Sequence, residues 1–264
     1  MKENGIWFSK SQSEVSYPEE GNELCSTIED NSYWFQHRNN CISEVVRSFP
    51  PSGAVFDIGG GNGFVSMALQ AMGLDVVLVE PGIIGARNAK ARGVDSVICS
   101  TLENAGFHKN SLPSIGLFDV IEHIDEDEIF LHTIRNFMVG KGKVYITVPA
   151  YNFLWSSEDD VAGHYRRYTK SDLKHKLAMA GFTTIYSSYF FSFFVIPIFL
   201  LRTLPSRLML RKAVILEQVK KEHSLPPGMI GALLNRVFQK EISLIRRQKS
   251  VPFGGSCLVV AEAT

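Results

Sequence analysis

Four glycines occupy the five positions from Gly59 to Gly63, directly after a mostly apolar run over residues 54–58. Glycine tolerates positive φ and has no side chain, so such a loop lets the backbone turn sharply and approach a ligand closely. A tight turn without a ligand is the simpler interpretation, but an acid, Glu80, ends the next apolar run. The segment therefore predicts a strand, a ligand-binding loop and a helix, as at the start of an α/β sheet.

The spacing of these glycines limits the ligand. A dinucleotide fingerprint requires Gly-x-Gly-x-x-Gly, but Phe64 or Ser66 stands where the third glycine belongs. A phosphate loop requires Gly-Lys-Ser or Gly-Lys-Thr, and neither follows the glycines. Glu80 could accept hydrogen bonds from the paired hydroxyls of a ribose, and Asp57 could accept one from an amino group. These residues suit a nucleoside that carries an amino group and no phosphate.

Short apolar runs alternate with helical patterns after residue 54, which is typical of a parallel sheet covered by helices on both faces. Thr169 and Asp172 form a predicted capping box at the start of one helix, and Gly181 ends that helix. The predicted fold is α/β, a Rossmann-like sheet of seven strands over residues 54–58, 75–80, 96–99, 115–121, 143–149, 183–191 and 256–262.

Charge and cysteine content narrow the class of protein. Lysine plus arginine and aspartate plus glutamate each number 27, so no surplus of positive charge favours a nucleic-acid partner. The amino-terminal residues lack the apolar core of a signal peptide. The four cysteines form no Cys-x-x-Cys pair, so neither a zinc knuckle nor a disulfide framework is indicated; they are Cys25, Cys41, Cys99 and Cys257. Both observations predict a protein of the reducing cytoplasm.

Four successive segments also resemble a known family. The segments 55–63, 79–81, 118–123 and 142–149 are similar, in order and spacing, to the motifs of class I S-adenosylmethionine-dependent methyltransferases. The likeness is greatest to the broad ubiquinone-biosynthesis-like branch. It implies seven strands with the last antiparallel, and S-adenosyl-L-methionine as cofactor with S-adenosyl-L-homocysteine as product.

The resemblance also implies cofactor-binding positions. Glu80 would contact the ribose, and the turn at Ser100, Thr101 and Leu102 would lie beside the adenine. Relatives often carry an acid in that turn, whereas this chain carries hydroxyls, so a hydroxyl, backbone group or water would make the contact. The predicted cofactor-binding residues are Asp57, Gly59, Gly61, Gly63, Glu80, Pro81, Ser100, Thr101, Leu102, Phe118, Arg38 and Trp34.

The first fifty residues are predicted to form a helical lid, and residues 51–264 the methyltransferase domain with a helical insertion at 192–253. The segment Tyr33 to Asn39 is similar to a lid motif in which aromatic residues cover the cofactor and Arg38 meets its carboxylate. Trp34 and Phe35 could equally be ordinary core contacts of a helix.

Two histidines lie where the methyl acceptor is expected. His123 follows the fourth predicted strand, whose carboxyl end faces the ligand crevice of an open α/β sheet. It could act as a general base, or Glu122 and His123 could cap the next helix, or Asp119, Glu122 and His123 could bind a metal. We assign no metal ligand from the sequence. The second histidine, His164, lies in the segment Gly163 to Tyr168.

That second segment resembles a Gly-His-x-Arg-Arg-Tyr element of the branch. Arg166 or Arg167 could clamp an acidic or phosphorylated acceptor, or pair internally with Asp159 or Asp160. The predicted catalytic residues are His123, His164, Tyr165 and Arg167.

Residues 181–201 carry no charge. A membrane span is rejected because the first part alternates as a strand and Pro197 interrupts the rest. Either a buried strand and helix form the acceptor pocket, or residues 189–212 make peripheral membrane contact. Basic residues directly after the apolar stretch favour the second interpretation; they are Arg202, Arg207, Arg211 and Lys212. Further positive charge before the last strand could equally belong to solvated helix faces; it comes from Lys220, Lys221, Arg246, Arg247 and Lys249.

The sequence thus predicts an S-adenosylmethionine-dependent methyltransferase, cytoplasmic and with membrane association in the second interpretation, that acts on a small or lipid-like organic acceptor. A cofactor-binding module without catalysis, acting as a sensor or partner subunit, is the alternative. A nicotinamide oxidoreductase comes third. The acceptor atom and the oligomeric state are not predicted.

Overall fold

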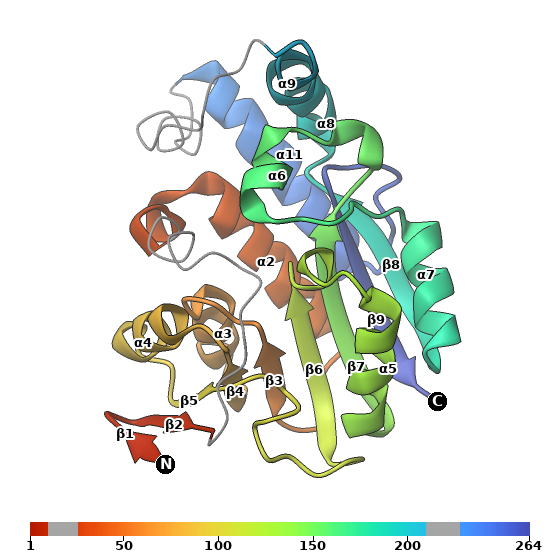
Figure 1. The fold of residues 1–264 in the computed structure, drawn as a ribbon. Helices are drawn as coiled ribbons and strands as arrows, with labels where there is room; N and C mark the ends of the chain where they lie inside the picture. The colour runs from red at the N-terminus through yellow and green to blue at the C-terminus, as the bar shows by residue number, and fades with distance from the viewer. Residues whose placement is uncertain (10–25, 210–227) are drawn as a thin grey trace.

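The computed structural model describes residues 1–9, 26–209 and 228–264, and one mixed sheet runs through all three ranges (Figure 1). Its strand order is β1-β2-β5-β4-β3-β6-β7-β9-β8. The bounds are β1 (Lys2–Glu3), β2 (Ile6–Phe8), β3 (Val55–Ile58), β4 (Val76–Val79), β5 (Ser96–Cys99), β6 (Leu112–Phe118), β7 (Met138–Pro149), β8 (Phe182–Phe190) and β9 (Ser256–Ala263).

The seven strands from β3 to β9 are those predicted from the sequence. Neighbours from β5 through β7 pair in parallel, whereas β9 is antiparallel to both β7 and β8. The implied antiparallel last strand is therefore confirmed. The predicted strand over 115–121 ends earlier, at Phe118, because Asp119 adopts a left-handed φ of 59° and Ile121–His123 form a short helix, η2.

The first eight residues differ from the helical lid predicted for residues 1–50. They form the β1–β2 hairpin, and β2 extends the sheet in parallel to β5. Asn4 and Gly5 both have positive φ, which suits the tight turn of a two-residue hairpin. The buried side chain of Ile6 joins a small core with Leu78 and Val97. Among the described residues up to position 50, helix is found at residues 26–31 and 33–48.

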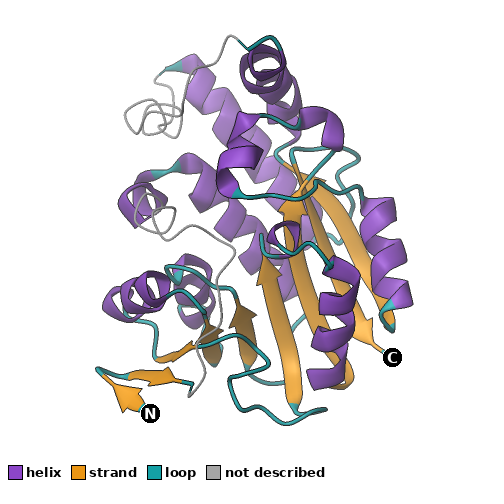
Figure 2. Cartoon of the chain, in the orientation of Figure 1, coloured by secondary structure: helices purple, strands orange, loops and turns teal. Residues whose placement is uncertain are grey.

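Helices cover both faces of the sheet (Figure 2). Alternate strand residues explain the two layers: Ile115 and Val144 pack with α5 and α7 on one face, whereas Tyr145 and Leu258 pack with α2, α3 and α11 on the other. The helices are α2 (Tyr33–Ser48), α3 (Phe64–Gln70), α4 (Ile83–Arg92), α5 (Asp127–Phe137), α6 (Ser157–Ala162), α7 (Lys170–Met179), α8 (Val195–Ile198), α9 (Leu204–Arg207) and α11 (Met229–Arg246).

The capping box predicted at the start of α7 is confirmed. The Thr169 hydroxyl accepts from the Asp172 amide, and the Asp172 carboxylate accepts from the Thr169 amide at 3.1 Å. Gly181 follows the helix with a φ of 85°. These contacts satisfy backbone groups that a helix end leaves without partners.

The apolar stretch after β8 folds into short helical pieces. These are η4 (Ser192–Phe194), α8, the π-helical segment η5 (Phe199–Thr203) and α9. No helix among the described residues is long and apolar enough to cross a membrane. In Figure 1, α6, α8 and α9 lie above the carboxyl ends of β6 and β7. Four of the basic residues considered for membrane contact lie outside the described residues; they are Arg211, Lys212, Lys220 and Lys221.

Candidate active site

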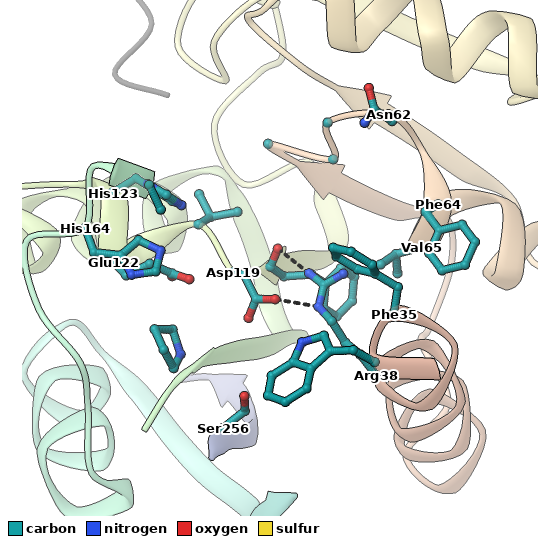
Figure 3. A pocket seen from close by; sticks show the side chains of 18 of the residues that line it. Phe35, Arg38, Asn62, Phe64, Val65, Asp119, Glu122, His123, His164 and Ser256 are labelled. Carbon is teal, nitrogen blue, oxygen red and sulfur yellow. Dashed lines mark hydrogen bonds and ion pairs between the residues drawn. The ribbon is translucent and has the colours of Figure 1, made fainter. Parts of the chain in front are cut away.

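A cavity of about 510 Å³ opens at the carboxyl ends of the central strands. Its walls come from α2, the glycine loop after β3, the ends of β4 and β6, and the segment around α6. Figure 3 shows Glu122, His123 and His164 grouped on one side of this pocket, with Phe64 and Val65 on the other. A ligand crevice outside the carboxyl ends of parallel strands is the usual location in an open α/β sheet.

The glycine loop forms one wall of the pocket, and its backbone packs closely against neighbouring side chains. Gly59 and Gly61 have φ angles of 69° and 52°. A Cβ atom at Gly60 would lie 2.8 Å from Oδ2 of Asp57, and one at Gly59 would lie 3.0 Å from Val120. Any larger residue would displace these neighbours, so the loop needs glycine both for its conformation and for its close approach.

Glu80 links β4 to the glycine loop. Its Oε2 accepts from the Gly61 amide at 2.9 Å, and its Oε1 accepts from the Gly82 amide at 2.7 Å. Burial raises the pKa of Glu80 to about 7, although the two amides act in the opposite direction. The carboxyl group lines the pocket with lone pairs beyond those the amides use.

Asp57 leaves one carboxylate oxygen without a partner. Its Oδ2 accepts from the Ser66 hydroxyl at 2.6 Å, whereas the buried Oδ1 has no hydrogen-bond partner among the described residues. Burial raises its pKa to about 6, against the effects of Ser66 and Arg38. A buried oxygen of this kind beside a cavity suits a ligand that brings a positively charged donor.

Arg38 reaches the pocket from α2, as the sequence predicted, but its charge is already paired. Its Nη2 donates to the Phe118 carbonyl at 2.8 Å, and its Nε lies 2.5 Å from Oδ2 of Asp119. Trp34 also lines the pocket and stacks on Phe191, with ring centroids 3.6 Å apart. Helix α2 is therefore anchored both to the end of β6 and to the segment after β8.

Asp159 organises the opposite side of the pocket. The carboxylate is 1% exposed; its Oδ1 lies 2.8 Å from Nδ1 of His164, and it binds Arg167 through both oxygens at 2.8 and 2.9 Å. Arg166 instead pairs with Asp125 and Asp127. Both arginines are thus paired with acidic residues of the protein itself. The pair of Arg167 with Asp159 is one of the alternatives that the sequence left open. Neither arginine is placed as a clamp for an acidic acceptor.

His123 and Glu122 line the same side of the pocket as His164. The ring centroids of His123 and His164 are 4.7 Å apart. Burial, and then His164, lower the pKa of His123 to about 4. Burial and the nearby Asp119 carboxylate raise the pKa of Glu122 well above its usual range. The pocket therefore contains a neutral imidazole beside a carboxyl group that is costly to ionise.

Most of the residues predicted from the sequence line this cavity, but four do not. Gly63 lies at the start of α3 against Ala89 and Val94. Tyr165 is 52% exposed and contributes its backbone amide to the Glu122 carbonyl. The Ser100 hydroxyl donates to the Thr101 carbonyl, and Leu102 is buried in the core; of that turn only Thr101 reaches the pocket.

Several lining residues were not among the site residues predicted from the sequence. Some of them lie in segments whose motifs were recognised, or were discussed for another role; they are Phe35, Gly60, Asn62, Asp119, Val120, Glu122, Pro149 and Asp159. The others carried no motif, because long-range packing brings them to the pocket; they are Glu29, Phe64, Val65, Ile124, Glu158, Ala162, Ile198, Arg202, Gly255 and Ser256.

Comparison with known proteins identifies the family. Residues 33–187, more than half of the chain, match the model of a methyltransferase domain. The chain belongs to this methyltransferase family. The match confirms the predicted S-adenosylmethionine-dependent methyltransferase at the level of the family. No curated protein matches the chain significantly.

Solved structures show the same fold at low identity. A SAM-dependent methyltransferase from Archaeoglobus fulgidus is 16% identical with a TM-score of 0.52, over 85% of this chain and 94% of its own. Phosphoethanolamine N-methyltransferase 2 from Haemonchus contortus is 18% identical with a TM-score of 0.57, over 94% and 58%. The [4+2]-cyclase SpnF is 13% identical with a TM-score of 0.58, over 96% and 98%. The cyclase shows that this fold does not fix the reaction.

Proposed function

We propose that this protein transfers the methyl group of S-adenosylmethionine to a small or lipid-like organic acceptor. One observation carries the proposal: the buried carboxylates of Glu80 and Asp57 face one cavity from either side of the glycine loop, and Asp57 Oδ1 lacks a partner among the described residues. A ribose diol and an ammonium group are the donors that such a pair would bind. The proposed cofactor has both groups.

The residues on the cofactor side of the pocket would bind the cofactor and take no part in the chemical step. Glu80 would accept from the ribose hydroxyls while its bonds to Gly61 and Gly82 fix the carboxylate in place. Asp57 would accept from the amino group, and Pro81 and Thr101 would flank the adenine. Bound S-adenosylmethionine supplies an electrophilic methyl group on its sulfonium.

The acceptor side must align the attacking atom with that methyl group and exclude water. His123 and His164 face this side, and Asp159 holds Nδ1 of His164, so Nε2 can accept a hydrogen bond from the acceptor. Arg167 supports Asp159 and has a positioning role. The exposed side chain of Tyr165 takes no part in this arrangement.

A lipid-like acceptor is supported by the surface beside the pocket. Ile198 and Arg202 line the cavity, and the same segment exposes large apolar side chains. Such a surface suits peripheral contact of a cytoplasmic enzyme with a membrane, from which an apolar acceptor could enter. The exposed side chains, from η4 to the residue that follows α9, are Phe193, Ile196, Leu200, Leu201, Leu204 and Leu208.

Motif order also supports membership of the ubiquinone-biosynthesis-like branch, whose acceptors are diverse. Calorimetry with S-adenosylmethionine, S-adenosylhomocysteine and NAD tests the cofactor, and binding of NAD alone would overturn the proposal. Transfer of a radiolabelled methyl group into small-molecule and lipid fractions tests the reaction. Cofactor binding without transfer into any fraction would favour the non-catalytic binding module instead.

A further inference from the structure

Three metal-ligating side chains meet on the acceptor side of the pocket. Glu122 and His123 belong to the short helix η2 after β6, and His164 follows α6. One donor atom from each residue lies within 4.8 Å of the other two. Figure 3 shows the three side chains together beside the cavity that they line. The sheet thus brings together side chains that are about forty residues apart in the sequence.

Glu122 supplies an independent observation. The residue is only 1% exposed, and its Oε2 has no hydrogen-bond partner anywhere in the described parts of the chain. Burying a carboxylate without a partner is costly, and a coordinated cation is one of the few groups that offsets this cost. The carboxylate that carries this unsatisfied oxygen belongs to the same cluster as the two imidazoles.

The surroundings of His164 are those of a metal ligand. Asp159 Oδ1 lies 2.8 Å from its Nδ1, which fixes the ring and leaves Nε2 as the donor to a metal. Metal-binding histidines usually hydrogen-bond a carboxylate or carbonyl through their second nitrogen. Arg167 in turn holds Asp159 by both oxygens. The imidazole is therefore oriented before any ligand arrives.

Asp119, which the sequence suggested as a third ligand, is engaged elsewhere. Its Oδ2 pairs with Arg38, and its Oδ1 accepts from the Thr147 hydroxyl at 2.9 Å. His164 takes its place in the donor set. The candidate metal ligands are therefore one carboxylate and two imidazoles, rather than two carboxylates and one imidazole.

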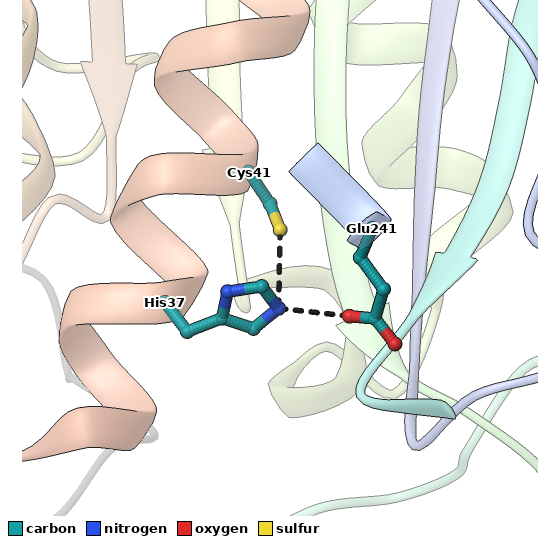
Figure 4. Close-up of side chains that lie close together, drawn as sticks. All are labelled: His37, Cys41 and Glu241. Carbon is teal, nitrogen blue, oxygen red and sulfur yellow. Dashed lines mark hydrogen bonds and ion pairs between the residues drawn. The ribbon is translucent and has the colours of Figure 1, made fainter. Parts of the chain in front are cut away.

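A second cluster of similar composition makes a useful contrast. His37 and Cys41 of α2 meet Glu241 of α11 in the core (Figure 4). Here Glu241 is fully engaged: it accepts from His37 at 2.8 Å, from the Phe191 and Ser192 amides, and from the Ser192 hydroxyl. This cluster lines no part of the described cavity, and it joins α2 to α11. We therefore propose no metal for it.

We propose that Glu122, His123 and His164 bind a divalent transition-metal cation. Two imidazoles and a carboxylate are donors that Zn²⁺, Co²⁺ and Fe²⁺ accept. Three protein ligands leave at least one coordination position for a molecule in the cavity. The cation would hold an oxygen of the methyl acceptor at that position; this last step rests on the proposed function, whereas the cation site does not.

Cobalt provides a test that needs no activity. The untagged full-length protein is treated with chelator and titrated with Co²⁺, and the visible absorption of the bound ion is followed. We expect one Co²⁺ per chain, displaced by Zn²⁺, and binding at least about tenfold weaker in Glu122→Gln and in His164→Ala. His132→Ala, on an exposed position of α5, is the matched control and should bind as the wild type does.

Absence of Co²⁺ binding in the wild type, or equal binding in both variants and the control, would overturn the site. Circular dichroism checks the folding of each variant, and His164→Gln replaces His164→Ala if the latter does not fold. Binding of S-adenosylhomocysteine is measured separately. If the wild type binds Co²⁺ but not S-adenosylhomocysteine, the proposed function is overturned and the metal site stands. If it binds S-adenosylhomocysteine but not Co²⁺, only the metal site is overturned.

Discussion

The Gly61 amide donates to the Glu80 carboxylate across 2.9 Å, which ties the glycine loop to the end of β4. The same carboxylate faces the pocket, so one side chain both shapes the loop and offers acceptors to a ligand. This double use makes Glu80 the residue whose removal should affect the cofactor most.

Glu80→Ala should weaken the binding of S-adenosylhomocysteine by about tenfold or more, because a charged hydrogen-bond acceptor is lost. Isothermal titration calorimetry at pH 8 measures the effect. Glu103→Ala removes an exposed acid just beyond the Thr101 turn and should leave the affinity unchanged. An unchanged affinity in Glu80→Ala would remove Glu80 from the site.

Cofactor affinity should rise with pH. Burial raises the pKa of Glu80 to about 7 and that of Asp57 to about 6, so both groups lose their protons mainly between pH 5.5 and 8. In the proposed complex, only the ionised carboxylate of Asp57 would pair with the ammonium of the cofactor. We expect tighter binding of S-adenosylmethionine at pH 8 than at pH 5.5, and a shallower dependence in Asp57→Asn. A flat profile in the wild type would contradict this account.

The stability of the ligand-free protein should change with pH in the opposite direction. A carboxyl group whose pKa is raised on folding stabilises the fold while protonated, and this contribution is lost as the pH rises through the folded pKa. Between pH 6.5 and 8 the Glu80 effect acts without opposition from His123, because the depressed pKa of His123 makes the stability rise with pH only up to its unfolded value near 6.5. Thermal unfolding should therefore occur at a lower temperature at pH 8 than at pH 6.5. Glu80→Ala should reduce this difference.

The cluster of His37, Cys41 and Glu241, which joins α2 to α11, should be a main source of stability for the fold. Glu241→Ala leaves His37 and the amides of Phe191 and Ser192 without their acceptor in the core. Removal of one partner from a buried polar network of this kind costs about 3 kcal/mol or more. Urea unfolding measures the loss. Lys240→Ala, on an exposed position of the same helix, should change the free energy of unfolding by less than about 0.5 kcal/mol.

The sequence predicted those parts of the fold that depend on local patterns. Alternating apolar runs located β3 to β9, and a capping box located α7. The β1–β2 hairpin was missed although Asn4 and Gly5 are a recognised turn pair, because its strands are only two and three residues long and depend on pairing with the distant β5.

The candidate site was predictable on the cofactor side and less so on the acceptor side. The glycines, Asp57 and Glu80 follow strand ends, so their positions derive from the sheet itself. His164 and Tyr165 are neighbours in one motif, yet the backbone places the first in the pocket and the second in solvent. Asp159 decides this arrangement by holding His164 and Arg167. The sequence offered the pair with Arg167 as one alternative, but nothing in it indicated the contact with His164.

The apolar surface of η5 and α9 gives the last prediction. Leu201 and Leu208 are 71% and 57% exposed beside a segment that also lines the pocket, so contact with lipid would bury them. Sedimentation with vesicles of phosphatidylglycerol and phosphatidylcholine should bring down the wild type, and Leu201→Asp should reduce the bound fraction several-fold because a charge would enter the lipid. Ile129→Asp, which alters a 60% exposed apolar residue on α5, should bind as the wild type does. Equal loss in both variants would show that the apolar surface has no specific role, and the acceptor would then have to reach the pocket from solution.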